Sequence, residues 1–438
     1  RASVFERGTA MAEEIIIVQG NDTLAGEVAV SGAKNSALKL IAAALLGHGA
    51  TTLRNVPLIS DIDIMSEVLR RLGAVVERDG HSLLVDTTAV AAWETPYELV
   101  SKMRASISVL GPLIGRFGRA RVAMPGGCQI GARKIDMHLV GLEAIGVEFS
   151  MDHGFLEAST PRGLHGAHVV LDFPSVGATE NLLMASVVAE GRTVIENAAR
   201  EPEIVDLASM LSSMGARVSG AGAAIIEVDG VSLGDLHPCE HTTVGDRSEA
   251  GTFLAGGALT GGPLAVRGID PSYLRVALMK LSSMGCDVET GKDWVSVRRT
   301  RPLRPIDIQT LPHPGFPTDL QAQFMLLAAR AEGMSVITEN VFENRFMFAS
   351  ELARMGADIA IEDHHALVRG VGVLQGADVS STDLRAGAAL VLAGIAAEGE
   401  TRVHNIAHID RGYEDYAGKL RALGADVVRA EMDAASGR

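Results

Sequence analysis

Charged residues recur at the predicted starts of helices in six similar stretches of the chain, and these residues could do chemistry. They are Lys34 with Asn35, Arg104, Ser175 to Gly177, Arg247 with Glu249, Asp319, and Asp383 with Arg385. Loops after the following strands add Asp61, the glycine-rich stretch 126–133, Glu201, Arg345 and Arg411. A helix start offers free N–H groups and partial positive charge, which favour anions. The set predicts a site for phosphates and carboxylates. The alternative, helix capping at the surface, suits any single residue better than the whole set.

A glycine-rich segment, MPGGCQIGARKIDMH, holds the cysteine with the strongest chemical signal. Cys128 follows two glycines and precedes Arg133 and Lys134, and nearby cations favour the thiolate. Such a thiol can serve as a nucleophile or as a proton donor. The alternative is an inert thiol, which is what we expect of Cys286, and the pattern alone leaves both open.

One further cluster, His237, Cys239 and His241, has residue types that bind metals. A single cluster without partners elsewhere is more typical of a polar linker. The chain has no Walker loop, no G-x-G-x-x-G after a first strand and no G-x-S-x-G, which disfavours most cofactor-binding and hydrolase classes.

The elements that must position these residues come from an internal repeat. Each unit is predicted to contain an apolar helix, a strand, a second helix, and two more strands. The second helices end at glycines spaced 68 to 73 residues apart: Gly73, Gly146, Gly215, Gly285, Gly356 and Gly424. Glycine suits this position because a helix that turns into a strand needs positive φ. The first helix of each unit is apolar nearly all round and should be buried. We therefore expect an α/β fold with these helices inside and sheets outside.

Composition narrows the class of protein. The 438 residues allow two or three domains, and six units group most simply as three plus three, with a boundary near 231–244. The net charge of −15 argues against nucleic acid as a partner. Three cysteines suggest reduced thiols, and no signal peptide or long apolar run is visible, so we expect a cytoplasmic protein.

Many motifs in order give the chain a strong family resemblance. From about Ile15 to about Val428 it resembles the UDP-N-acetylglucosamine 1-carboxyvinyltransferases, a family of enolpyruvyl transferases. The motifs are SGAKN at 31–35, KMRASISVLGPLIGRFG at 102–118, PGGCQIGAR at 125–133, SVGATEN at 175–181, NAAREPEIVDLA at 197–208, PGFPTDLQAQF at 314–324, ENRFMF at 343–348, DLRAGAALVLAG at 383–394 and HIDRGYE at 408–414. The resemblance implies two inside-out α/β domains of three units each, with a cleft between them.

The same resemblance implies domain bounds. Residues 34–243 would form the first domain, and residues 11–33 with 244–431 the second. Residues 1–10 and 432–438 would be flexible termini. The empty cleft should stay open because its converging positive ends repel one another, and anionic substrate should draw the halves together.

The implied reaction moves an enolpyruvyl group from phosphoenolpyruvate to the 3′-hydroxyl of UDP-N-acetylglucosamine and releases phosphate. It runs by addition and elimination through a tetrahedral ketal, without metal or organic cofactor. As the first committed step of peptidoglycan synthesis it would serve cell wall, cell shape and division. The family's sensitivity to fosfomycin implies alkylation of Cys128.

Residue roles follow from the matched motifs. Asp319 would take the proton of the sugar hydroxyl, and Cys128 would act as general acid or in product release. Lys34, Arg133 and Arg411 would hold phosphoenolpyruvate. The nucleotide sugar would contact Asn35, Arg104, Arg133, Lys134, Ile135, Asp136, Met137, Ser175, Val176, Gly177 and Val341. Arg345, Asp383 and Arg385 would supply supporting charges.

The chain departs from the family's pattern at two places, and two other functions compete with this interpretation. Many family members carry a lysine where this chain has residues 58–60, and another where it has Phe173 and Pro174, so one or two peripheral substrate contacts differ. The shikimate-pathway enolpyruvyl transferases are the first rival, but they lack the PGGC segment. A paralogue that only binds nucleotide sugar is the second, and the presence of Lys34, Cys128, Asp319 and Arg411 weighs against it.

Overall fold

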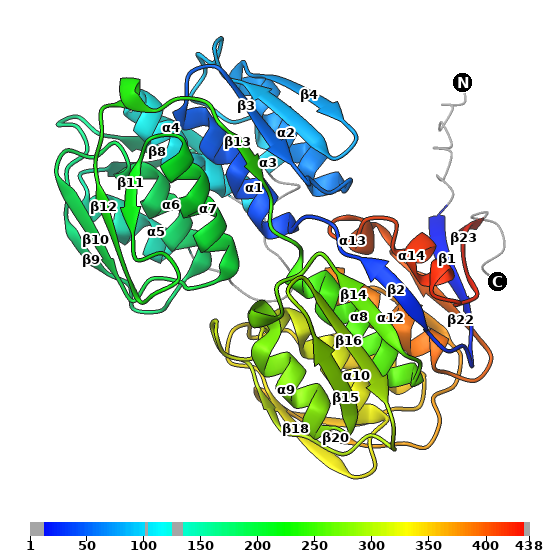
Figure 1. Cartoon of the computed structure of the whole chain (residues 1–438). Coiled ribbons are helices and arrows are strands. Elements are labelled where there is room, and N and C mark those ends of the chain that lie inside the picture. The colour runs from blue at the N-terminus through cyan, green and yellow to red at the C-terminus, as the bar shows by residue number, and fades with distance from the viewer. Residues whose placement is uncertain (1–12, 101–103, 125–134, 433–438) are drawn as a thin grey trace, which may run out of the picture.

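The structure, a computed structural model, describes residues 13–100, 104–124 and 135–432, without the side chains of residues 100 and 104–106. Six helix–strand units follow one another as the repeat predicts. Figure 1 shows units one to three lying beside units four to six, with the N-terminal strands next to the later units. The α/β fold with six units is therefore confirmed.

The first three units run from α1 to β13. Unit one contains α1 (Lys34–Ala43), η1 (Ala44–Leu46), β3 (Ala50–Arg54), α2 (Ser60–Leu72), β4 (Val75–Asp79) and β5 (Ser82–Asp86). Unit two contains α3 (Tyr97–Val100), η2 (Arg104–Val109), α4 (Leu110–Phe117), β6 (Arg119–Ala123), α5 (Asp136–Ala144), β7 (Glu148–Asp152) and β8 (Phe155–Ser159). Unit three contains β9 (His168–Val170), α6 (Val176–Ser186), β10 (Arg192–Glu196), α7 (Pro202–Ser213), β11 (Arg217–Ser219) and β12 (Ile225–Asp229), followed by η3 (Leu233–Asp235) and β13 (Glu240–Thr242).

The last three units take in both ends of the described chain. Unit four contains β2 (Gly26–Ala29), α8 (Arg247–Thr260), β14 (Leu264–Arg267), η4 (Pro271–Leu274), α9 (Arg275–Ser283), β15 (Cys286–Thr290) and β16 (Trp294–Arg299). Unit five contains β17 (Ile308–Gln309), η5 (Thr318–Leu320), α10 (Gln321–Ala329), β18 (Met334–Thr338), α11 (Ala349–Arg354), β19 (Asp358–Glu362) and β20 (His365–Arg369). Unit six contains β1 (Glu13–Gln19), β21 (Asp378–Ser380), α12 (Leu384–Ile395), β22 (Glu400–His404), α13 (Ala407–Asp410), α14 (Tyr416–Ala422) and β23 (Val427–Met432).

Each unit builds one sheet from three antiparallel strands, as in the order β3-β5-β4. Among the described strands, five of the six sheets gain a fourth, parallel strand from a neighbouring segment: β13, β9, β2, β17 and β21. In unit six the third strand is β1, which lies between β22 and β23 and pairs antiparallel with both. The N-terminus is thereby tied to the C-terminal unit.

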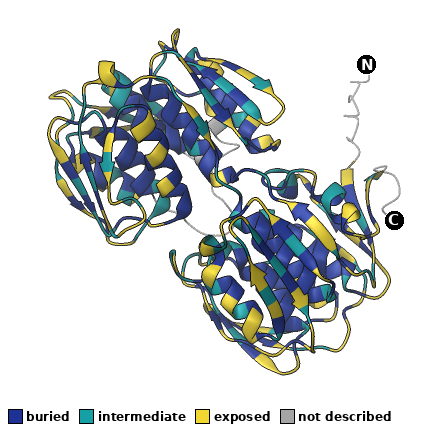
Figure 2. Cartoon of the chain, viewed as in Figure 1, coloured by how far each residue is buried: buried dark blue, intermediate teal, exposed yellow. Residues whose placement is uncertain are grey.

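The first helix of each unit is buried and the sheets lie outside, as Figure 2 shows. Helices α8, α10 and α12 pack on one another, and α4 packs on α6. All the residues of α12 except the first are buried. One apolar core joins residues of units one to three, and a separate core joins units four to six with β1 and β2. This separation supports the bounds 34–243 and 11–33 with 244–431, which stay a prediction.

The repeated glycines have the conformation that the sequence predicts. Gly73 caps α2 with φ of 105°, and the other five glycines have φ between 92° and 109°. A side chain is strained in that region, so glycine is what allows each second helix to turn directly into a strand. None of the helices in the described residues has both the length and the apolar character needed to cross a membrane.

An arginine caps the C-terminal end of the first inner helix, α1 with its η1 turn. Arg116 of α4 donates from Nη1 to the carbonyls of Leu45 and Gly47, both at 2.7 Å, and from Nη2 to the carbonyl of Thr87 at 2.9 Å. Leu45 lies in η1, Gly47 directly follows it and Thr87 directly follows β5, and all three residues are buried. A cation at a helix C-terminus also complements its partial negative charge.

We predict that Arg116→Ala lowers the free energy of unfolding by about 3 kcal/mol, because buried carbonyls lose charged donors. Urea unfolding measures the change. The control is Arg71→Ala, which removes an exposed ion pair with Glu67 and should cost under about 1 kcal/mol. Equal losses in the two variants would show that the carbonyl contacts contribute little.

Candidate active site

One buried carboxylate joins cations from the two groups of units. Lys34, the first residue of α1, places Nζ 2.7 Å from Oδ2 of Asp61. Arg411, which follows α13, places Nε 2.9 Å from Oδ1 of the same carboxylate. Only 2% of the Asp61 side chain is exposed. Asp61 lies in the first turn of α2, not in the loop that the sequence suggested. It therefore fixes two predicted phosphoenolpyruvate ligands side by side.

Burial and neighbouring charge shift the pKa values of this group. Burial lowers the pKa of Lys34; pairing with Asp61 opposes that change, and Arg411 and Arg385 add to it. Burial alone would raise the pKa of Asp61, but Lys34 and Arg411 outweigh it and hold that pKa below its ordinary value. Asp61 is thus a fixed anion, while Lys34 sits among cations that favour loss of its proton. An incoming anion would relieve that repulsion.

A second carboxylate, Asp319, lies between two arginines. Arg345 Nη2 donates to Oδ1 at 2.8 Å, and Arg385 Nη2 donates to Oδ2 at 3.3 Å. Both arginines are buried, whereas 26% of the Asp319 side chain is exposed. Burial would raise the pKa of Asp319, but Arg385 and Arg345 outweigh it and hold the pKa well below its usual range. The group is therefore an ionised proton acceptor whose basicity is suppressed while both arginines bind it.

Helix α12 and its neighbours fix Arg385. Asp383 is the N-cap of α12, and its Oδ1 accepts from the backbone N–H of Arg385 at 2.8 Å. The guanidinium lies over the Tyr413 ring, 5.2 Å from its centroid. The Tyr413 hydroxyl is 2.8 Å from Thr252 Oγ1 of α8. Arg385 is thus oriented by its own helix start and by an aromatic face.

Two further contacts cross between the groups of units. Arg247 Nε of α8 donates to Glu203 of α7 at 3.0 Å, and the His313 N–H donates to Glu201 at 3.3 Å. Arg247, at a predicted helix start, thus forms an ion pair that joins the two groups of units. Lys34, Arg247, Arg345, Arg385 and Arg411 each have a carboxylate partner, so these cations are not unopposed. The expectation that anionic substrate draws the halves together stays a prediction.

The stretches predicted for the nucleotide sugar lie on α5 and α6, which pack together. Ser175 caps α6 and accepts from the N–H of Ala178, and Val176 begins that helix. Gly177 lies against the His138 ring, since an added Cβ would come within 3.0 Å of it. Residues 135–137 open α5: Ile135 is buried, Asp136 is exposed and Met137 is intermediate. This brings 135–137 and 175–177 side by side.

Other predicted residues stand apart or lie outside the description. Asn35 is exposed on α1, beside Lys34. Val341 follows β18, and its N–H donates to Glu339 at 2.9 Å. Arg104 begins η2, with its side chain outside the described residues, as are Cys128, Arg133 and Lys134 altogether. In the described part of the chain no three His, Cys, Asp or Glu side chains are grouped so as to hold a metal ion.

Several buried carboxylates among the described residues received no role in the sequence analysis, and two of them matter most here. Glu339 and Glu180 have 3% and 1% relative exposure. Glu180 belongs to the SVGATEN motif and is the one charged residue of α6, where its Oε2 lies 2.8 Å from Lys39 Nζ of α1. Burial raises the pKa of Glu180 to about 7, with Lys39 opposing and Glu203 and Glu201 adding to the shift.

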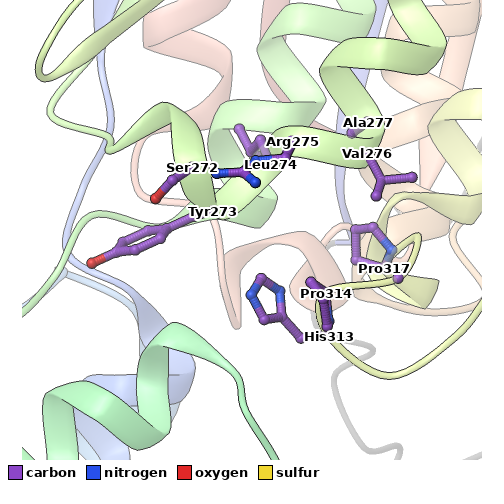
Figure 3. Close-up of a pocket in the computed structure, with 10 residues that line it drawn as sticks. Ser272, Tyr273, Leu274, Arg275, Val276, Ala277, His313, Pro314 and Pro317 are labelled. Atoms are coloured by element: carbon purple, nitrogen blue, oxygen red, sulfur yellow. The ribbon is translucent and has the colours of Figure 1, made fainter. Parts of the chain in front are cut away.

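A pocket of about 260 Å³ lies beside this site, between the η4–α9 turn and residues 313–317 (Figure 3). Tyr273, Arg275 and His313 line it, and burial lowers the pKa of His313 to about 4. None of the predicted site residues lines this pocket, although Asp319 follows Pro317 by two residues. The charge clusters, not this pocket, mark the candidate active site.

Comparisons with known proteins agree with this geometry. A family model described as EPSP synthase (3-phosphoshikimate 1-carboxyvinyltransferase) matches residues 18–420. The crystal structure of the enolpyruvyl transferase NikO from Streptomyces tendae has a TM-score of 0.86 at 30% identity, covering 96% of this chain and 100% of that one. EPSP synthase from Acinetobacter baumannii shares the fold, with a TM-score of 0.74 at 17% identity over 95% of this chain and all of that one.

The curated relatives are more similar still. The UDP-N-acetylglucosamine 1-carboxyvinyltransferase 2 of Carboxydothermus hydrogenoformans is 53% identical over 418 residues, covering 95% of this chain and 99% of the relative. The chain belongs to the enolpyruvyl transferase family, and within it to the group of UDP-N-acetylglucosamine 1-carboxyvinyltransferases.

Glu180 gives a prediction about stability and pH. Its folded pKa lies above the ordinary 4.5, so the wild type should lose stability as pH rises from about 4.5 to about 7, whereas Glu180→Gln stays neutral. The shift corresponds to at most about 3 kcal/mol. Relative to the variant, the wild type should thus be more stable at pH 5 than at pH 8.

Urea unfolding at the two pH values measures this difference. Glu190→Gln, a change at an exposed glutamate nearby in sequence, is the matched control and should follow the wild type. A stability difference between wild type and Glu180→Gln that is the same at both pH values would remove Glu180 as the source.

Proposed function

We propose that this enzyme transfers the enolpyruvyl group of phosphoenolpyruvate to the 3′-hydroxyl of UDP-N-acetylglucosamine and releases phosphate. The observation that carries the proposal is the identity of about half the residues, over nearly the whole chain, with relatives named for this reaction. The site supports it, because the partly exposed carboxylate of Asp319 lies beside two buried arginines. Two polyanionic substrates and a neutral hydroxyl nucleophile need that combination.

The rival functions have less support. The solved EPSP synthases are similar at 17% and 18% identity, which speaks for the fold alone. A paralogue that only binds nucleotide sugar would not need the paired arginines around Asp319, and those are present with Lys34 and Arg411.

We place phosphoenolpyruvate at the cations around Asp61. Lys34 and Arg411 are held close together by that carboxylate, and Arg133 joins them by the family resemblance. The nucleotide sugar lies along the α5 and α6 starts, by the same resemblance, with the sugar hydroxyl toward Asp319. Anionic substrate then competes with Asp61 and Asp319 for their cations, which draws together side chains from both groups of units.

In the addition step, the 3′-oxygen bonds to C2 of phosphoenolpyruvate and its proton passes to Asp319, while C3 gains a proton from the general acid, one of the two roles that the resemblance gives to Cys128. A carboxylate that both arginines bind is a weak base. When a negatively charged group of the substrate accepts some of the hydrogen bonds that the arginines now donate to Asp319, the carboxylate loses that stabilisation. The pKa of Asp319 then rises toward a range that suits proton transfer. The base is therefore strengthened only when substrate is bound.

In the elimination step, C3 returns its proton to the group that supplied it, the C2–O bond to phosphate breaks, and phosphate leaves with the proton that Asp319 had taken up. We assign to Cys128 the role of acid or of a group that aids product release, on the sequence resemblance. The reaction needs no redox partner, since every electron pair stays within the two substrates.

The wider setting is proposed on the same basis. The product is the first committed precursor of peptidoglycan, so the protein would act in cell wall synthesis and through it in cell shape and division. Three sparse cysteines suit the reducing cytoplasm, and UDP-N-acetylglucosamine and phosphoenolpyruvate would be its small-molecule partners.

The first test is phosphate release by the purified full chain. We expect release from phosphoenolpyruvate only when UDP-N-acetylglucosamine is added, with none when shikimate 3-phosphate replaces it. A colorimetric phosphate assay measures both. Turnover with shikimate 3-phosphate alone would reverse the assignment, and turnover with neither acceptor would favour the binding-only paralogue.

The second test concerns the base. Asp319→Asn should lower kcat about 10²- to 10⁴-fold, because a neutral amide cannot take the hydroxyl proton. Calorimetric titration should still detect nucleotide-sugar binding. Asp363→Asn, at an exposed turn in the same unit, is the matched control and should keep normal activity. Near-normal turnover in Asp319→Asn would exclude it as the base.

A further inference from the structure

Glu339 is a buried carboxylate that accepts four hydrogen bonds next to the proposed base. Its Oε1 accepts from Thr310 Oγ1 at 2.9 Å and from the N–H groups of Val341 and Phe342 at 2.9 and 3.1 Å. Its Oε2 accepts from Thr318 Oγ1 at 2.9 Å. The residue directly follows β18 and is almost fully buried. One side chain thus ties the turn at 339–342 to η5, the turn that carries Asp319.

Arg345 is held on two sides by groups that Glu339 fixes. On its edge, Nη1 donates to Thr318 Oγ1 at 3.1 Å. On its face, the guanidinium carbon lies 5.3 Å from the centroid of the Phe342 ring. Thr318 and Phe342 both donate to Glu339. The remaining nitrogen, Nη2, is then directed at Asp319 Oδ1, 2.8 Å away.

The chemistry of Glu339 also sets the direction of these hydrogen bonds. An ionised carboxylate only accepts, so the Thr318 hydroxyl must donate its single hydrogen to Glu339. Its lone pairs are then left for the Arg345 N–H. A neutral group with a donor at this place would compete for the lone pairs and leave the hydroxyl hydrogen without that acceptor.

We propose that Glu339 is a positioning residue for the proposed reaction, which orients Arg345 and through it Asp319 by way of the Thr318 hydroxyl. The inference rests on the proposed role of Asp319 as base. Glu339 itself lies behind the turn that carries the base and acts through Thr318 and Arg345. Its contacts to the 341–342 backbone also couple the base to the stretch predicted to meet the nucleotide sugar.

The test uses Glu339→Gln in the full chain, which keeps the shape of the side chain and changes one acceptor into a donor. We expect kcat to fall by about 10- to 100-fold, because small misplacements of reacting groups have effects of this size. The low-pH limb of kcat/KM should move to higher pH, since a misaligned Arg345 no longer holds down the pKa of Asp319. Glu362→Gln, at an exposed glutamate on β19, is the control and should change neither.

A double-mutant cycle separates positioning from general loss of structure. Thr318→Val removes the hydroxyl that links Glu339 to Arg345, whereas Thr318→Ser keeps it. If Glu339 acts through this hydroxyl, the Glu339→Gln/Thr318→Val double variant should be no more than about threefold slower than the slower single variant. Losses that multiply would overturn the proposal, as would an unshifted low-pH limb in Glu339→Gln.

The outcome stays decisive if Glu339→Gln does not fold. Thr318→Val should then lose about tenfold or more in kcat while Thr318→Ser stays within about threefold of wild type, and equal activity in the two would overturn the inference. An inactive wild type would instead count against the proposed function, and an active wild type with an active Asp319→Asn variant against the base assignment.

Discussion

The cations that gather at the candidate site need a carboxylate beside each group of them, and the rest of the site depends on that pairing. Asp61 holds Lys34 and Arg411, and Asp319 holds Arg345 and Arg385. Without these anions, cations withdrawn from water and placed near helix N-termini would repel one another strongly. Charge compensation therefore decides where each cation points, and it also joins the two groups of units.

The same pairing has a consequence for binding. If substrate binds where we propose, its anions exchange with carboxylates that already pair with the cations. The net gain in binding free energy is therefore smaller than the number of arginines suggests. The cations are, however, already oriented before substrate arrives. Preorganised donors of this kind stabilise charge that develops in a transition state without further rearrangement. The exchange also ties the basicity of Asp319 to occupancy of the site.

Order around the base is built in layers. The inner helices, rich in Ala and Gly, pack closely and fix the helix starts. Asp383 then caps α12 and sets the backbone of Arg385, while Glu339 sets the turn from which Phe342 and Arg345 extend. Asp383 and Glu339 both act as carboxylate acceptors, and because an ionised carboxylate only accepts, each hydrogen bond to it can run in one direction only. The apolar core thus keeps the helices rigid, and the carboxylates orient the side chains around the proposed base.

The sequence by itself determined the six units, their marker glycines, the buried first helices, the family and most of the helix starts that carry charge. These features are local: a period, a glycine at a helix end, or a motif of several residues. The tertiary structure alone decided which charges pair. Asp61 and Arg411 are 350 residues apart in the chain, and nothing near either residue in the sequence indicates the other. Glu180 and Glu339 went unnoticed for the same reason, because the pKa of one and the four donors of the other depend on neighbours that only folding brings into contact.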